Sequence, residues 1–203
     1  MVGLGEIQAN IITDSIEDWR DQDDVLQPNG AENYYYQSLP NPYLPKNGLF
    51  GVPEELLLVR SISPEIYYGR KSMTERGERM EWYGLQKYFT TFTNANRINV
   101  NSAPLAVLAA IPGVNYQTAV RIRTMVQDLP VVRLSQIIER IPGIPTESTS
   151  YLSTVRSNLY TLVSDGRLRD SSVINRIRCV VRVDETSKTG YTLLYWNESN
   201  LEM

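Results

Sequence analysis

Residues 102–127 read SAPLAVLAAIPGVNYQTAVRIRTMVQ, and this stretch decides the fold class of its part of the chain. Ser102 is a candidate helix N-cap, and Pro104 stands where the first turn of a helix tolerates proline. Apolar side chains then recur at helical spacing until Ile111-Pro112-Gly113-Val114, where proline and glycine predict a turn. A second helix is expected over Tyr116–Gln127. The stretch therefore predicts a helical hairpin.

A second segment repeats this pattern further along the chain. Leu134–Ile141 predicts a helix, Ile141-Pro142-Gly143-Ile144 a turn, and Ser148–Leu152 another short helix. Two such units in succession indicate that this region is mainly helical.

The region before the hairpins combines short helices with irregular chain. Isoleucines at helical spacing predict a helix over Gly5–Trp19, and the prolines and glycines that follow predict irregular structure as far as Gly51. Short helices are expected over Val52–Val59 and from Ser63-Pro64. Residues Arg70–Met80 are polar and charged, which predicts an exposed, mobile connection.

The period of the apolar residues changes to two after residue 156. In RIRCVVRV, residues 176–183, apolar side chains alternate with arginines, as in a half-buried antiparallel strand. Tyr191–Trp196 and Asn158–Val163 are the expected neighbouring strands. The predicted fold class is α+β, with a mainly helical domain over residues 1–152 and a small antiparallel sheet over residues 153–203.

Composition excludes several classes of function. The 203 residues contain no histidine and a single cysteine, Cys179, which removes imidazole metal sites, Ser-His-Asp catalysis and any disulfide within the chain. No apolar run approaches the ~20 residues of a membrane-spanning helix. Glu54, Glu55 and Glu81 do not stand out from ordinary surface carboxylates, so we expect no enzymatic activity.

An acidic loop follows the first predicted helix and carries Asp18, Asp21, Asp23, Asp24, Asn29, Glu32 and Asn33. Calcium takes six to eight oxygen ligands from carboxylates, amides and carbonyls on flexible loops, and this loop offers such a set. Its spacing is not that of an EF-hand. The alternative is a solvated acidic turn that caps the preceding helix.

The two Pro-Gly hairpins also resemble helix-hairpin-helix (SAM-like) units, some of which bind nucleic acid. In those units a Gly-x-Gly turn presents backbone N–H groups to a phosphate. Here Asn115 replaces the second glycine in the first hairpin, and Pro145, which has no N–H, replaces it in the second. A nucleic-acid-binding module is therefore the alternative function.

An ordered series of motifs resembles one protein family. It comprises residues 18–24 (DWRDQDD), 29–33 (NGAEN), Tyr36, 41–43 (NPY), 46–47 (KN), 54–56 (EEL), 59–60 (VR), 98–104 (INVNSAP), 107–108 (VL), 111–113 (IPG), 158–163 (NLYTLV), Gly166 and 191–196 (YTLLYW). These motifs are similar to those of the type II secretion minor pseudopilins of the K type (GspK-like), and they cover most of the chain.

The resemblance implies a structural subunit whose helical domain is inserted into a pilin-like sheet. A family member stands at the tip of the periplasmic pseudopilus, on the periplasmic side of the bacterial inner membrane. It supports protein export beside the I and J minor pseudopilins, with secreted substrates as further candidate partners and no nucleic acid.

The resemblance also implies a calcium ion in the helical domain. By family analogy the carboxylate ligands are Asp21, Asp23 and Glu32, with Asp18, Asp24 and Asn101 as further candidates. The family's leader peptide, membrane-spanning first helix and N-terminal strands have no counterpart here. We therefore expect Met1 to begin a shortened form, with membrane anchoring only through that first helix.

Overall fold

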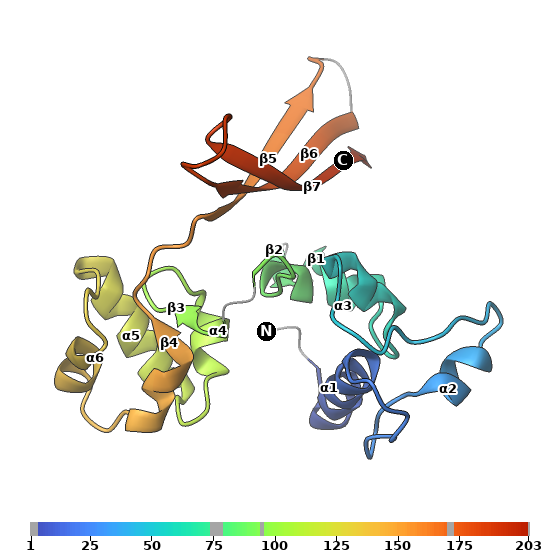
Figure 1. Cartoon of the computed structure of the whole chain (residues 1–203), viewed down its shortest axis with the longest axis horizontal. Helices are drawn as coiled ribbons and strands as arrows, with labels where there is room; N and C mark the ends of the chain where they lie inside the picture. Colours follow the sequence, from blue (N-terminus) through green and yellow to red (C-terminus); the bar gives the residue numbers. More distant parts are fainter. Residues whose placement is uncertain (1–3, 74–78, 94–95, 170–172, 203) are drawn as a thin grey trace. The chain divides into compact units, whose positions relative to one another are not determined.

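The structure, a computed structural model, describes residues 4–73, 79–93, 96–169 and 173–202 (Figure 1). The chain forms two compact units, residues 1–91 and residues 92–203. Among the described residues, none of the helices combines the length and the apolar character that crossing a membrane requires.

The first unit consists of short helices and one two-stranded hairpin. Its elements are α1 (Glu6–Arg20), α2 (Asn33–Gln37), the 3-10 helix η1 (Pro53–Leu58), α3 (Pro64–Tyr68), β1 (Gly69–Met73), β2 (Arg79–Tyr83) and the 3-10 helix η2 (Leu85–Lys87). The strands β1 and β2 pair in antiparallel register.

A single apolar core holds these elements together. It contains Ile12, Trp19, Ala31, Tyr36, Leu56, Val59, Ile62, Ile66 and Tyr67. Trp19, on the last turn of α1, meets Tyr36 edge to face at 5.2 Å and stacks on Phe50 at 6.5 Å between ring centroids. The indole therefore ties the end of α1 to loops that follow much later in the sequence.

Two expectations for this unit need correction. Residues 70–80 were expected to form an exposed connection, but their described part forms β1 and the start of β2, while residues 74–78 lie outside the described residues. The stretch expected to stay irregular contains the short helix α2. The predicted first helix is confirmed by α1, and Ser63 caps α3 by accepting a hydrogen bond from the Ile66 N–H at 3.4 Å.

The second unit begins with helices that two short strands flank in the sequence. The elements are β3 (Ile98–Asn99), α4 (Leu105–Ala109), α5 (Tyr116–Asp128), α6 (Ser135–Arg140), the 3-10 helix η3 (Thr146–Tyr151) and β4 (Leu152–Ser153). Pro104, and not Ser102, is the N-cap residue of α4. The parallel pairing of β3 with β4, which joins the two ends of this helical segment, was not predicted.

The turns of both hairpins use glycine in the left-handed region. Gly113 has a φ of 78° and Gly143 a φ of 87°, which a residue with a Cβ rarely adopts. The core beneath the hairpins contains Val100, Ala103, Leu108, Ile111, Val114, Ala119, Ile122, Val126, Val131, Ile137, Ile141, Ile144 and Leu152. The apolar pattern of the sequence therefore places these helices correctly.

The chain ends in a three-stranded antiparallel sheet with the order β5 (Leu159–Arg167), β6 (Val173–Val183), β7 (Tyr191–Glu202). Leu162 pairs with Cys179, and Cys179 pairs with Trp196, so these three side chains share one face. The α+β class is confirmed. The helix-hairpin-helix-like and pilin-like descriptions stay predictions. The domain boundary at residue 152 also stays a prediction. Helices give way to the sheet there, inside the second unit.

Candidate cation site in the acidic loop

The last turn of α1 places Asp18 and Asp21 at the start of the acidic loop. Asp18 is fully buried, at 0% exposure, and the neighbouring Trp19 belongs to the core. Asp21 is the C-cap residue of α1, and its N–H donates to the Glu17 carbonyl at 3.0 Å. The end of α1 therefore carries two of the carboxylates at the start of the loop.

The loop folds back so that Gly30 lies against the Asp18 carboxylate. The Gln27 N–H donates to Asp18 Oδ1 at 3.1 Å. A Cβ at Gly30 would overlap with Asp18 Oδ2, so a larger residue there would displace the Asp18 carboxylate. Burial raises the pKa of the Asp18 carboxyl, the Gln27 N–H lowers it, and the charge of Asp21 raises it further.

Glu32 is the second buried carboxylate of the loop, with 7% of its surface exposed. Burial, together with the charges of Asp18, Asp21 and Asp24, raises the pKa of Glu32 to about 7. The charges of three further predicted ligands thus act on Glu32, in addition to its burial.

Several oxygens of this cluster are buried and lack a hydrogen-bond partner. They are Asp18 Oδ2, Asp21 Oδ1 and both carboxylate oxygens of Glu32. A buried, unpartnered carboxylate oxygen is costly, and a bound cation is the usual compensation. The donor set consists of hard oxygens, which suits calcium and does not suit a soft metal.

The remaining acidic side chains of the loop are exposed and engaged locally. Asp23 Oδ1 accepts from the Val25 N–H at 2.9 Å, and Asp24 Oδ1 accepts from Asn33 Nδ2 at 2.6 Å. The second carboxylate oxygen of each residue takes no part in these two hydrogen bonds. Asp23 and Asp24 therefore lie at the rim of the cluster.

Asn101 belongs to the second unit, and its amide there joins two backbone segments. Its Nδ2 donates to the Val131 carbonyl at 2.9 Å, and its Oδ1 accepts from the Val131 N–H at 2.7 Å. Both polar atoms of the side chain are thus used in holding the loop before α6.

Two residues outside the acidic loop belong to the KN and VR motifs of the family resemblance. Arg60 donates from a guanidinium nitrogen to the Gly30 carbonyl at 2.7 Å and so holds the loop against the unit. Asn47 has a buried Oδ1 without a hydrogen-bond partner and a positive φ of 45°. In the sequence, Asn47 belongs to the KN motif, and the Asn-Gly pair at residues 47–48 predicts a turn.

The described carboxylates do not yet surround a single point. Among residues 4–73, 79–93, 96–169 and 173–202, no three side chains of His, Cys, Asp or Glu are grouped so that they could hold a metal ion. The fit to a cation rests on the unpartnered oxygens.

Comparisons with known proteins agree on one family. Residues 1–71 match the family model described as type II secretion system (T2SS), protein K. The type II secretion system protein K of Aeromonas hydrophila is 40% identical over 63 residues, which are 30% of this chain and 19% of that protein.

The fold is similar to that of a protein in a solved complex. One chain in the crystal structure of the GspK-GspI-GspJ complex from the enterotoxigenic Escherichia coli type 2 secretion system superposes with a TM-score of 0.66 at 15% identity. The alignment covers 97% of the present chain and 65% of that chain, so the present chain spans only part of its relatives. Residues 1–71, which contain the acidic loop, are thus similar to the type II secretion system protein K family, and the chain shares its fold with a protein of the GspK-GspI-GspJ complex.

Proposed function

We propose that this chain is part of a minor pseudopilin of the K type, which stands at the tip of the type II secretion pseudopilus and supports protein export across the outer membrane. The observation that carries the proposal is the family match over residues 1–71, which contain the whole acidic loop. The partners would be the I and J minor pseudopilins, with which a protein of the same fold was crystallised. The periplasmic side of the inner membrane is the corresponding location.

A structural role also agrees with the contacts of Glu55, one of the carboxylates that the sequence does not distinguish from ordinary surface charge. Glu55 forms an ion pair with Lys46 at 2.8 Å and accepts from the Gly51 N–H at 2.9 Å, so it serves the loop in which it lies. The side chain of Glu81 lies outside the described residues. The protein K family is structural, and catalysis has no support from the described geometry.

The acidic loop is proposed to bind calcium. Asp18, Asp21 and Glu32 would supply buried carboxylate oxygens. Asp23 and Asp24 would supply exposed carboxylate oxygens at the rim. Asn101 remains a candidate ligand by family analogy. Calcium binds about six to eight oxygen ligands in irregular geometry, whereas magnesium requires near-octahedral geometry and retains water. The ion would supply the positive charge that offsets the repulsion among these carboxylates.

Calcium bound there would stabilise the first unit by joining its elements. Asp18 and Asp21 stand at the end of α1, while Glu32 directly precedes α2. An ion shared by these groups would fix the loop between the two helices. A surface that docks against neighbouring subunits benefits from such rigidity, because less ordering is required on binding.

Nucleic-acid binding, the alternative, has less support because the first hairpin turn is occupied by the protein itself. Ser148 Oγ donates to the Pro112 carbonyl at 2.7 Å, and a Cβ at Gly113 would lie 2.8 Å from Pro145 Cγ. The turn that would face a phosphate in a nucleic-acid-binding hairpin therefore packs against η3 and the residue before it.

Copurification tests the proposed role. A longer form of the protein that includes the first helix is coexpressed with the I and J pseudopilins, and residues 1–203 serve as the comparison. We expect the longer form to join both partners in a stable complex and the shorter form to bind weakly or not at all. If neither form associates while residues 1–203 bind a short duplex in a salt-sensitive manner, the chain is a nucleic-acid module instead.

A further inference from the structure

The acidic loop carries two consecutive apolar residues that the fold leaves in solvent. Val25 is 69% exposed and Leu26 is 60% exposed, and neither belongs to the core of the first unit. A single exposed apolar side chain needs no explanation, but neighbouring ones with a polar rim mark sites of interaction. We therefore asked what else lies beside this pair.

Hydrogen bonds hold the backbone on both sides of the exposed pair. The Val25 N–H donates to Asp23 Oδ1 at 2.9 Å, and the Gln27 N–H donates to Oδ1 of the buried Asp18 at 3.1 Å. The Gly30 N–H then donates to the Gln27 carbonyl at 3.0 Å. Because the backbone is fixed in this way, little further ordering is required when a partner binds.

A third large side chain is exposed where the loop reaches α2. Asp24 Oδ1 accepts a hydrogen bond from Asn33 Nδ2 at 2.6 Å, which joins the residue before Val25 to the residue before Tyr34. Tyr34 is 89% exposed, so nearly all of its ring is available for contact. We call Val25, Leu26 and Tyr34 the loop patch.

The charge around the loop patch is almost entirely negative. Residues 14–33 contain seven carboxylates and one cation, Arg20. Two of these carboxylates, Asp23 and Asp24, directly precede Val25 and are exposed. Exposed apolar side chains inside a charged rim are typical of a protein interface. A negative rim attracts lysine and arginine and repels an anionic lipid or a nucleic acid.

We propose that the loop patch docks a protein segment whose apolar side chains are bordered by lysine or arginine. The three exposed side chains supply the apolar contact, and Asp23 and Asp24 supply the attraction for the basic residues. This surface goes beyond the proposed function. The hydrogen bonds that hold it lie within the chain and do not require a bound ion.

Fluorescence anisotropy with a labelled synthetic peptide of leucine and lysine tests the docking surface. The buffer contains calcium, so that any cation site stays filled. We expect the peptide to bind residues 1–203, more weakly as salt is added because the rim charges are then screened. A peptide in which glutamate replaces lysine should not bind. If the leucine-lysine peptide does not bind, or if both peptides bind equally, the proposal is wrong.

Substitutions place the binding on the loop patch. Leu26→Ser and Tyr34→Ser should each lower the affinity for the leucine-lysine peptide about tenfold, as truncation of a central interface side chain does. Both should melt like the wild type, because the two side chains are exposed. Wild-type affinity in both variants would show that the peptide binds elsewhere and would overturn the proposal.

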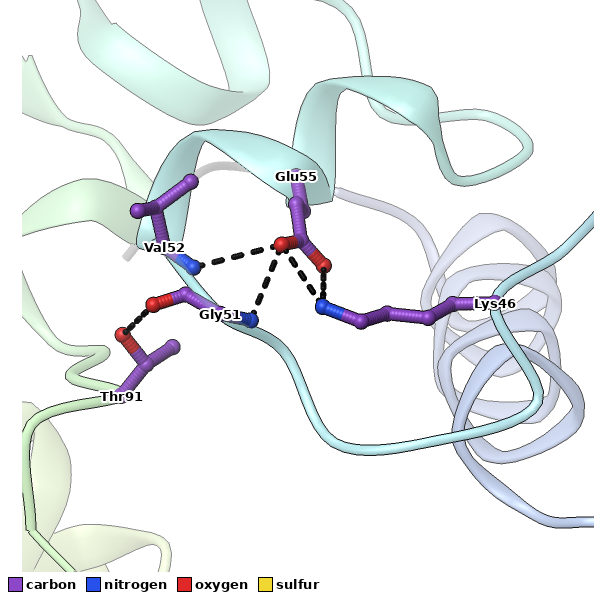
Figure 2. Close-up of polar contacts among 5 residues, drawn as sticks. All are labelled: Lys46, Gly51, Val52, Glu55 and Thr91. Atoms are coloured by element: carbon purple, nitrogen blue, oxygen red, sulfur yellow. Dashed lines mark hydrogen bonds and ion pairs between the residues drawn. The ribbon is translucent and has the colours of Figure 1, made fainter.

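Leu49 provides the matched control, since it is a leucine with 70% exposure on a loop that is also held in place. Figure 2 shows the contacts that hold this loop. Lys46 Nζ lies 2.8 Å from both carboxylate oxygens of Glu55, and the Gly51 N–H donates to Glu55 Oε1 at 2.9 Å. The charges of this loop are thus paired. Leu49→Ser should leave the peptide affinity unchanged, and a tenfold loss there would show that exposed leucines bind the peptide without regard to the acidic rim.

A membrane surface is the other class of partner that exposed apolar loops contact, and cosedimentation with vesicles distinguishes it. Vesicles of phosphatidylcholine and phosphatidylglycerol are mixed with the wild type and with Leu26→Ser, again in calcium. We expect both proteins to stay in the supernatant. Sedimentation of the wild type that Leu26→Ser abolishes would assign the loop patch to a membrane and overturn the protein partner.

Discussion

The buried carboxylates of the acidic loop depend on single residues that make room for them. Gly30 is the clearest case, because the Asp18 carboxylate occupies the place of its absent side chain. Arg60 then fixes the Gly30 carbonyl from the other side. The position of Asp18 thus follows from a glycine and an arginine that are far from it in sequence.

Gly30→Ala should destabilise the chain by about 1–3 kcal/mol, as overpacking of a filled site does. The reason is the overlap of the new methyl group with Asp18 Oδ2. Thermal unfolding measures the effect. Gly5→Ala is the control, since nothing lies within 4 Å of a Cβ at Gly5, and it should change the melting temperature little. Equal melting of the two variants would contradict the described packing.

The raised pKa of Glu32 predicts an unusual dependence of stability on pH. The folded state binds the proton more tightly than the unfolded state, because the pKa of Glu32 rises from 4.5 to about 7. The metal-free protein should therefore lose stability as the pH rises through this window. The loss is at most roughly 3 kcal/mol, because a change of one pKa unit corresponds to about 1.4 kcal/mol. The lowered pKa values of Asp165 and Asp184 lie below this window.

Thermal unfolding in chelator between pH 5 and pH 8 measures this loss. Glu32→Gln should flatten the profile, because glutamine mimics the protonated acid, and only the smaller contribution of Asp18 would remain. Saturating calcium should offset the loss in the wild type, since it binds the ionised form. A metal-free melting temperature that is constant or rises over this range would show that Glu32 titrates normally.

At the scale of elements, the second unit is held together where its loops meet. The amide of Asn101 bonds both the N–H and the carbonyl of Val131, which closes the loop before α6. Ser148 ties η3 to the first hairpin turn. These contacts join segments about thirty residues apart, and neither is visible in a local sequence pattern.

Asn101→Ala should lower the stability of the chain by about 1–3 kcal/mol, because the Val131 N–H and carbonyl lose their part-buried partner. The Asn101 amide already forms hydrogen bonds with the Val131 backbone, so the substitution should leave the calcium affinity unchanged. Calorimetry on the variant decides the point. A loss of calcium affinity at wild-type stability would make Asn101 a ligand, as the family resemblance implies.

The sequence predicts those elements whose side-chain period is strong. The limits of α5 are right within one residue, because Asn115 caps it through a hydrogen bond to the Thr118 N–H and its apolar face is regular. The alternation in residues 176–183 likewise identifies β6. The hairpin of β1 and β2 was missed because residues 70–80 are polar on both sides and lack alternation.

The candidate site could be predicted only as far as its acidic residues. Composition identifies the loop, but burial separates Asp18 and Glu32 from the exposed Asp23 and Asp24, and burial depends on the packing of Trp19. The KN motif includes Asn47, but the sequence does not predict its left-handed backbone or the hydrogen bond from the Gly48 N–H to the Trp19 carbonyl.

At the scale of the whole molecule, the terminal sheet exposes an apolar face. Leu162, Leu193 and Trp196 are 54%, 50% and 51% exposed, and the strand register places them on the same side. Apolar surface of this kind on a small sheet marks a site of interaction. In the proposed pseudopilin it is the face available to the first helix or to neighbouring subunits.

Leu162→Asp should leave the stability of residues 1–203 within about 0.5 kcal/mol of the wild type, because the side chain is exposed. In the longer form it should reduce copurification with the I and J pseudopilins. Val163→Asp is the matched control, since Val163 is 56% exposed and lies on the opposite face of the same strand. Equal behaviour of the two variants in copurification would show that this face makes no contact.

Thermal unfolding of residues 1–203 in chelator, in calcium and in magnesium tests the central claim most directly. An ion that binds only the folded loop stabilises the protein by about 2.7 kcal/mol at a hundredfold excess over Kd. We therefore predict a melting temperature that rises with calcium, rises less with magnesium, and returns to its starting value with chelator. The Asp21→Asn, Glu32→Gln double variant should show no difference between calcium and chelator. A wild-type melting curve that is the same in all three conditions would contradict the account and leave the acidic loop as a solvated turn.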